Sequence, residues 1–281
     1  EKRTQGRLKI VLYPGETLGK IPDEWDMLRT GICDIAWILP MYYPGVFPLV
    51  DVSDLPFLMP EDRPLALLNS LFSEFLSDEF SEVKILWPGY LGVVRIHTVE
   101  KPVRSLDDLK GLQIRTPPGL IQEAIKALGA VPASVPAPEV YTALERHMVD
   151  GCVFPLEATA AYKIYEVAPY HTLANLGCGM TVTAMNANAW GSLPLEVQQV
   201  LEELSPWAQK LLNDAANAAD EEAVSIMREM GNTFIELSPD EQTRWAEATR
   251  SVIENWISEM EAKGLPARAL VQAIRQFAST R

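Results

Sequence analysis

The sequence is poor in the residues from which enzyme and metal sites are built. It contains only three histidines, His97, His147 and His171, and none of them lies in a metalloprotease or hydrolase motif. Neither of the two common glycine-rich nucleotide-binding patterns is present. The three cysteines lie far apart, without the spacing of a zinc site. We therefore expect no enzyme activity, no cofactor and no metal ion.

Cysteine pairs, long apolar runs and basic residues are scarce as well. Cys33, Cys152 and Cys178 are an odd number, so we expect buried free thiols, with a Cys152–Cys178 bridge as the alternative in an exported protein. No apolar run of about 18 residues occurs, which argues against stable membrane insertion. Lysine and arginine number 24 against 38 acidic residues, and the net charge of −14 disfavours nucleic-acid binding. A small anionic ligand is not excluded, because a local basic pair can dominate inside a cleft.

Short apolar runs that alternate with helical patterns are present throughout the first two thirds of the chain. The 281 residues, of which 48% are hydrophobic, suffice for one large domain or two modest ones. After Pro194 one helical pattern runs from 195 to 231, and another follows the Ser238–Glu241 capping signal. Strands are predicted at 7–15, 33–40 and 112–116 and as two short strands around Pro88, and helices at 119–128 and 138–148. The alternation predicts an α/β fold with open, mostly parallel sheets.

The stretch GLQIRTPPG, residues 111–119, places a single arginine at the end of an apolar strand. The two prolines that follow prevent further strand pairing. Arg115 therefore either caps a surface turn or faces a ligand where the strand ends. Open α/β sheets bind their ligands at the carboxyl ends of strands, which is consistent with the second interpretation.

Residues 108–151, DLKGLQIRTPPGLIQEAIKALGAVPASVPAPEVYTALERHMVDG, carry a family resemblance. Their order, spacing and residue types resemble the central segment of the DctP-type solute-binding proteins of TRAP (tripartite ATP-independent periplasmic) transporters. GVFPL and DLPFL before this segment, and KIYEVAPYHT and MNANAWGSLPLEVQQVL after it, fit as well, so the resemblance covers nearly the whole chain.

The resemblance implies a two-lobe periplasmic-binding-protein fold with a long helix, at about 195–231, that crosses between the lobes. Residues 1–93 and 183–220 are expected to form lobe I, and residues 94–182 and 221–281 lobe II. In the family a strand and a helix ordinarily precede the segment that resembles GRLKIVLYPG. We therefore expect both to be missing from this chain, with EKRTQG corresponding to the end of that helix.

The resemblance also implies a function. It indicates a periplasmic monomer that captures a small organic acid between its lobes, closes by hinge bending and delivers the acid to the membrane subunits of a TRAP permease. One alternative is a protein that presents its ligand to a membrane sensor. A periplasmic enzyme that acts on an organic acid is a weaker alternative.

The resemblance assigns the ligand carboxylate to Arg115, whose guanidinium offers a planar fork of donors that matches a carboxylate. Arg95 stands where many family members place a second arginine, the alternative being an ion pair near the hinge. Phe154 stands where several sugar-acid binders carry an asparagine. A ring at this position favours a less polar monocarboxylate, either a 2-oxo acid or an aromatic acid, while plain core packing is the alternative.

Further candidates lie at strand ends. Of Trp37, Tyr42 and Tyr43, we expect one to line the pocket and the others to form its wall, with Trp37 and Tyr42 as the ligand-binding candidates. Asn186 ends a strand and can donate an amide hydrogen bond to the ligand, with turn capping as an equal alternative. Glu157 is a weaker candidate, because no second acidic residue accompanies it to hold a cation.

Overall fold

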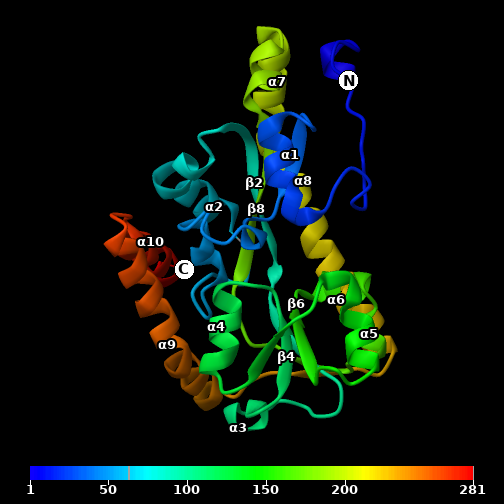
Figure 1. Cartoon of the computed structure of the whole chain (residues 1–281), viewed down its shortest axis with the longest axis vertical. Coiled ribbons are helices and arrows are strands. Elements are labelled where there is room, and N and C mark those ends of the chain that lie inside the picture. Colours follow the sequence, from blue (N-terminus) through cyan, green and yellow to red (C-terminus); the bar gives the residue numbers. More distant parts are fainter. Residues whose placement is uncertain (63, 281) are drawn as a thin grey trace.

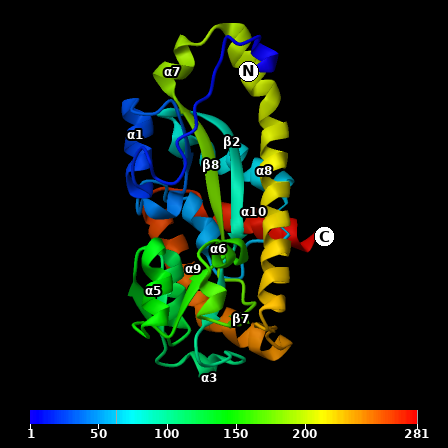
Figure 2. The same ribbon diagram turned by 90° about the vertical axis from the view of Figure 1, so that its right-hand side faces the viewer.

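The computed structural model describes residues 1–62 and 64–280 and shows two lobes, each built on its own β-sheet. The lobes follow each other along the long axis of the molecule (Figure 1). The helix α8 (Leu195–Glu229) runs beside both of them (Figure 2). The predicted long helix is thus present, and it continues through Pro206 without a break.

The sheet of lobe I has three strands, all antiparallel to their neighbours. In spatial order they are β1 (Ile35–Ile38), β8 (Cys178–Asn186) and β2 (Val83–Val93). Every residue of the central strand β8 is buried. β2 runs through Pro88 as one strand rather than the two that were predicted. It tolerates the proline because it lies at the edge of the sheet, where the missing N–H breaks no ladder.

The sheet of lobe II has six strands, of mixed direction. In spatial order they are β5 (Val131–Ser134), β4 (Gln113–Thr116), β6 (Gly151–Phe154), β3 (Arg95–Thr98), β7 (Tyr170–Thr172) and β9 (Thr233–Ile235). β4 is parallel to β5 and β6, whereas β3 is antiparallel to β6 and β7. β7 and β9 are parallel as well, so this sheet is mixed with mostly parallel pairs, whereas the sheet of lobe I is antiparallel throughout. β3 follows directly on the segment that comes from lobe I. It therefore runs in the opposite direction to β4 and β6, which are connected through helices within lobe II.

Two extended segments join the lobes. One leads from β2 into β3 through Val94, and the other leads from β7 to β8 through Leu176 and Gly177. They are hydrogen-bonded to each other, Val94 N to Gly177 O at 2.9 Å and Leu176 N to Val94 O at 3.2 Å. Gly177 has a φ of +122°, and a Cβ at this position would lie 2.9 Å from Asp54 Cα, so only glycine fits.

Helices cover both sheets. α4 shows the underlying pattern, because Ile121, Ala124 and Ile125 recur at helical spacing and are all buried. Among the described residues, no helix is both long and apolar enough to cross a membrane. The shorter helices are α1 (Glu24–Thr30), α2 (Leu65–Leu71), α3 (Leu106–Leu109), α4 (Leu120–Ala127), α5 (Val140–Glu145), α6 (Leu156–Ala161) and α7 (Ala187–Ser192).

The C-terminal helices pack differently from the predicted division of the chain. α9 (Pro239–Ala262) places Trp245 in the core of lobe II and Trp256 in the core of lobe I. α10 (Ala267–Ser279) packs into the core of lobe I. The lobe boundaries themselves stay a prediction, but this packing differs from the assignment of 221–281 to lobe II.

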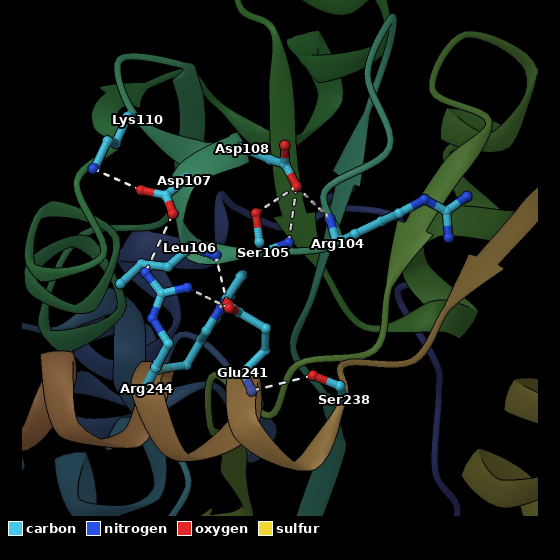
Figure 3. Close-up of polar contacts among 10 residues, drawn as sticks. Arg104, Ser105, Leu106, Asp107, Asp108, Lys110, Ser238, Glu241 and Arg244 are labelled. Carbon is cyan, nitrogen blue, oxygen red and sulfur yellow. Dashed lines mark hydrogen bonds and ion pairs between the residues drawn. The ribbon is translucent and has the colours of Figure 1, made fainter.

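Polar contacts fix the start of α9 against α3 (Figure 3). Ser238 accepts a hydrogen bond from Glu241 N at 3.3 Å, as the capping signal predicts, and Glu241 in turn accepts from Leu106 N at 2.8 Å. The hydrogen bond from Leu106 N is the main reason that the pKa of Glu241 lies below its ordinary value. A capping box also fixes the start of α3, where Asp108 accepts from Ser105 N at 2.8 Å.

The predicted strand at 7–15 is not present. Figure 1 shows the segment as an extended trace apart from both sheets, and Val11 and Leu12 are 61% and 82% exposed. An alternating pattern forms a strand only beside a partner, and none of the described strands pairs with this segment.

Candidate functional site

Arg115 lies near the end of β4 and is only 3% exposed. Its Nε donates to Val135 O at 2.8 Å, and its guanidinium lies over the ring of Phe154, 4.6 Å from the ring centroid. Burial lowers the pKa of Arg115, but a guanidinium remains protonated at neutral pH. Lobe II thus holds a permanently charged, nearly desolvated cation on an aromatic face.

The strand register explains why Arg115 and Phe154 meet. Arg115 pairs with Cys152, and side chains two residues apart on a strand share a face, so Phe154 is on the same side. Burial raises the pKa of the Cys152 thiol to about 12, which makes it an inert core residue rather than a nucleophile. The residues that the register places on this face are Arg95, His97, Arg115, Cys152, Phe154, His171 and Phe234.

Tyr42 brings lobe I into contact with this face. It ends a short 3-10 helix, Pro40–Tyr42, that follows β1. Its phenol lies close enough to the Arg115 guanidinium to oppose the lowering of the Arg115 pKa by burial. Of the candidates that the sequence suggests, Arg115, Phe154 and Tyr42 are the three that the structure brings together.

Tyr162 completes the cluster and was not predicted. It follows α6, and its ring lies 5.6 Å from that of Phe154 at an angle of 31°. The pKa of Tyr162 is raised, mainly by burial and secondly by the nearby Tyr42. Tyr42 and Tyr162 are therefore close enough to interact electrostatically. Tyr162 also lines a pocket of about 490 Å³, together with Tyr141, Ala161, Lys163 and Glu166. The only signal in the sequence was an aromatic residue one helix after Phe154.

Arg95 lies on the same sheet face, but both of its terminal nitrogens are engaged within the protein, while its buried Nε has no partner among the described residues. Its two terminal nitrogens bind both oxygens of Glu61, at 3.2 and 2.7 Å, and one of them also donates to Leu173 O at 3.0 Å. This is the ion-pair alternative that the sequence left open. Arg95 is thereby held beside the segment that joins the lobes.

Asn186 is used as a helix cap. Its Oδ1 accepts from Ala189 N at 2.9 Å, and its Nδ2 donates to Leu28 O and Arg29 O. Every polar atom of the side chain is thus engaged in fixing α7 and α1. The structure therefore supports the capping alternative rather than a contact with a ligand.

The remaining candidates are spread over lobe I and the helices of lobe II. Trp37 is 43% exposed on β1, and Tyr43 is buried against Phe47 in the core of lobe I. Glu157 begins α6, where its backbone N–H donates to Asp220. Among the described residues no three acidic, histidine or cysteine side chains are placed to hold a metal ion.

A buried arginine at a strand end, between two lobes joined by paired segments, is the arrangement of a binding protein. The family model of bacterial extracellular solute-binding proteins, family 7, called DctP, matches residues 1–259. The chain belongs to this family. The resemblance inferred from residues 108–151 is thereby confirmed, and with it the expectation that the protein binds a solute rather than converting one.

Individual relatives support the same assignment for this DctP-family protein. It is 27% identical over 276 residues to the C4-dicarboxylate-binding periplasmic protein DctP of Rhodobacter capsulatus, a match covering 95% of this chain and 82% of that one. The periplasmic location expected from the sequence agrees with the names of such relatives.

Solved structures of TRAP solute-binding proteins share its fold. One, from a marine metagenome, is specific for aromatic acid ligands and holds 3-hydroxybenzoate; its TM-score is 0.91 at 27% identity, over 99% of this chain and 89% of that one. Another, from Rhodoferax ferrireducens, holds copurified benzoate; its TM-score is 0.89 at 25% identity, with the same coverage of both chains. The two-lobe α/β fold expected for this DctP-family protein is therefore confirmed.

Proposed function

We propose that this solute-binding protein captures a small aromatic monocarboxylate, whose carboxylate binds Arg115 and whose ring contacts Phe154, Tyr162 and Tyr42. The observation that carries the proposal is the Arg115 guanidinium, which is buried on the Phe154 ring with its Nε anchored to Val135 O. The anchor fixes the plane of the guanidinium and leaves the terminal nitrogens for an acceptor from outside lobe II.

A carboxylate is the group that best fits these donors. Two parallel N–H···O bonds between a guanidinium and a carboxylate are stronger and more directional than bonds to a neutral oxygen. The Tyr42 phenol, which interacts with the guanidinium here, marks where an acceptor from the facing lobe lies. Because the site is largely desolvated, an ion pair formed there gains more than one formed in water.

The aromatic surroundings favour an aromatic acid over a sugar acid. Phe154 and Tyr162 present rings but no amide, and rings of this kind stack on an aromatic ligand at the separations seen between them. A polyhydroxylated ligand would leave its hydroxyl groups facing these rings without partners. The aromatic acids held by the two solved relatives are consistent with this choice.

Tyr42 of lobe I already lies close to Arg115 of lobe II, so opening of the lobes would admit the ligand and closure would enclose it between these two residues. We propose the paired segments through Val94 and Gly177 as the hinge. They cross from one sheet to the other, and each lies at the end of a strand, where a few residues can absorb the bending. We propose that the closed form is recognised by the membrane subunits of a TRAP permease. A membrane sensor is the alternative partner, and copurification with the permease subunits rather than with a sensor distinguishes them.

Thermal unfolding and calorimetry against benzoate, 3-hydroxybenzoate, pyruvate, succinate and glucuronate test the ligand class. A ligand at about 100 times its Kd adds about 2.7 kcal/mol of stability. We expect the two aromatic acids to raise the Tm most, and Arg115→Ala to abolish the shift. Arg104→Ala serves as the matched control, because Arg104 is exposed and its side chain points away from the contacts drawn in Figure 3. A shift confined to pyruvate or to glucuronate would refute the aromatic assignment.

A further inference from the structure

A pair of buried histidines lies on the same sheet face as Arg115 and Phe154. His97 on β3 pairs with Cys152 on one side and with His171 of β7 on the other. Both histidines are completely inaccessible to solvent, and their Nδ1 atoms are 2.8 Å apart. At this distance the N–H group of one imidazole must donate a hydrogen bond to the bare nitrogen of the other.

The surrounding hydrogen bonds decide which histidine donates. The Thr159 hydroxyl donates to Pro155 O at 2.9 Å, so its oxygen is an acceptor for His97 Nε2 at 3.0 Å. Phe154 O is a second acceptor for the same nitrogen, also at 3.0 Å. His97 therefore carries its proton on Nε2, and its bare Nδ1 accepts from His171.

This assignment leaves His171 Nε2 as the place where a further proton can enter. That nitrogen lies 2.7 Å from Asn232 Oδ1, which is the orientation of the amide that suits a protonated pair. In the neutral pair the Asn232 amide must present its NH₂ to the ring, and in the protonated pair it must present Oδ1, so a turn of the amide serves both states. Asn232 is therefore the residue through which the charge of the pair is tuned.

The pair is linked to the ligand site through Phe154. His97 holds the backbone carbonyl of Phe154, and the ring of Phe154 carries the Arg115 guanidinium. We infer that His97 and His171 are positioning residues of the carboxylate site, which hold Phe154 and Arg115 in their binding geometry while the pair is neutral. This inference rests on the proposed function, because it concerns the same site.

The charges around the pair oppose protonation. Arg95 lies two residues before His97 on the same face, and Arg228 of α8 lies over Phe234, whose ring is 5.0 Å from that of His171. Cys152, the remaining titratable neighbour in the register, stays protonated. Burial, the neighbouring imidazole and Arg95 lower the pKa of His97 to about 3, and burial lowers that of His171.

The direction of the pH effect follows. The folded pair binds protons less readily than free histidines, whose pKa is near 6.5. The folded pair therefore stays neutral well below that value, and the affinity for the aromatic acid should be nearly constant between about pH 5 and pH 8. Benzoate itself stays ionised down to about pH 5, so its own titration does not alter the profile.

The test measures the Kd of benzoate by calorimetry between about pH 5 and pH 8. We expect the affinity of the unmodified protein to stay nearly constant over this range. Asn232→Asp keeps the shape of the side chain but adds an opposite charge beside His171 Nε2, so it should raise the pKa of the pair by about one unit or more and bring a fall in affinity toward the acid side of the range. His147→Leu is the control, since the third histidine is exposed and should leave the profile unchanged.

Two further variants separate positioning from folding. His171→Leu leaves His97 Nδ1 without a donor and should weaken benzoate binding about tenfold at every pH, whereas His171→Asn restores a donor and should recover most of that loss. A flat profile in Asn232→Asp, or full affinity in His171→Leu, would overturn the inference. Failure of benzoate to bind at about pH 8, or binding that survives Arg115→Ala, would instead refute the proposed function.

Discussion

Replacement of Arg115 tests the site most directly, and the structure indicates the size of the effect. Arg115→Ala removes the partner of a desolvated carboxylate, which costs about 2 to 5 kcal/mol. Since each 1.4 kcal/mol is tenfold in affinity, we expect the Kd of benzoate to rise by roughly 30-fold to several thousand-fold. The unliganded protein should lose little stability, because the lost Nε–Val135 bond and the contact with Phe154 are offset by no longer burying a charge.

Arg115→Lys refines the same experiment. Lysine keeps the charge but cannot donate to Val135 O and to a carboxylate from one planar group. We expect a loss of affinity smaller than that of Arg115→Ala, with a similar Tm without ligand. Calorimetry gives the Kd and differential scanning fluorimetry gives the Tm. If Arg115→Ala binds benzoate as tightly as the unmodified protein while Arg104→Ala behaves normally, the assignment of Arg115 to the ligand is wrong.

Three predictions concern the frame around the site. Glu61→Gln removes the negative charge that binds both terminal nitrogens of the nearly buried Arg95, so the Tm should fall while the Kd of benzoate stays within about threefold. A change in Kd above tenfold would place Arg95 in the site. Burial raises the pKa of Asp54 to about 7, so the folded protein binds this proton more tightly than the unfolded chain and its contribution to stability is lost as the pH rises through that value. Asp54→Asn should therefore gain Tm over the unmodified protein between about pH 5 and pH 8, and parallel melting curves would contradict the assignment. Gly177→Ala should cost about 1 to 3 kcal/mol of unfolding free energy, whereas Gly191→Ala, which meets nothing within 4 Å, should cost far less; equal costs would remove the steric argument.

The sequence singled out Arg115 and Phe154, the centre of the proposed site, because their signal was local. A strand that ends in Arg-Thr-Pro-Pro can be recognised from consecutive residues, and the register then carries Phe154 to the same face. The role of Arg95 could not be decided from the sequence. It depends on the ion pair with Glu61, which lies in a loop far away along the chain, and no local pattern indicates that pairing. Tyr162 was missed for the same reason, since its packing on Phe154 depends on where α6 ends.

The fold shows the same division between local and distant information. Helices such as α4 and α9 were predictable, because their apolar spacing and caps lie within one segment. Strand direction was not, because β3 and β8 take their partners from far along the chain. Residues 7–15 alternate like a strand, but a pattern alone cannot supply the neighbour that a strand needs.

The helix α9 bears on how far the two lobes are separate modules. Trp245 and Trp256 stand about three turns apart on one continuous helix and fill the cores of different lobes. Neither lobe can be cut out of the chain without taking away part of the other's interior. A chimera that joins lobe I of one relative to lobe II of another would have to match this single helix to both cores at once. If Arg115 holds the ligand as proposed, ligand specificity should be easier to exchange by changing residues around Arg115 than by exchanging whole lobes.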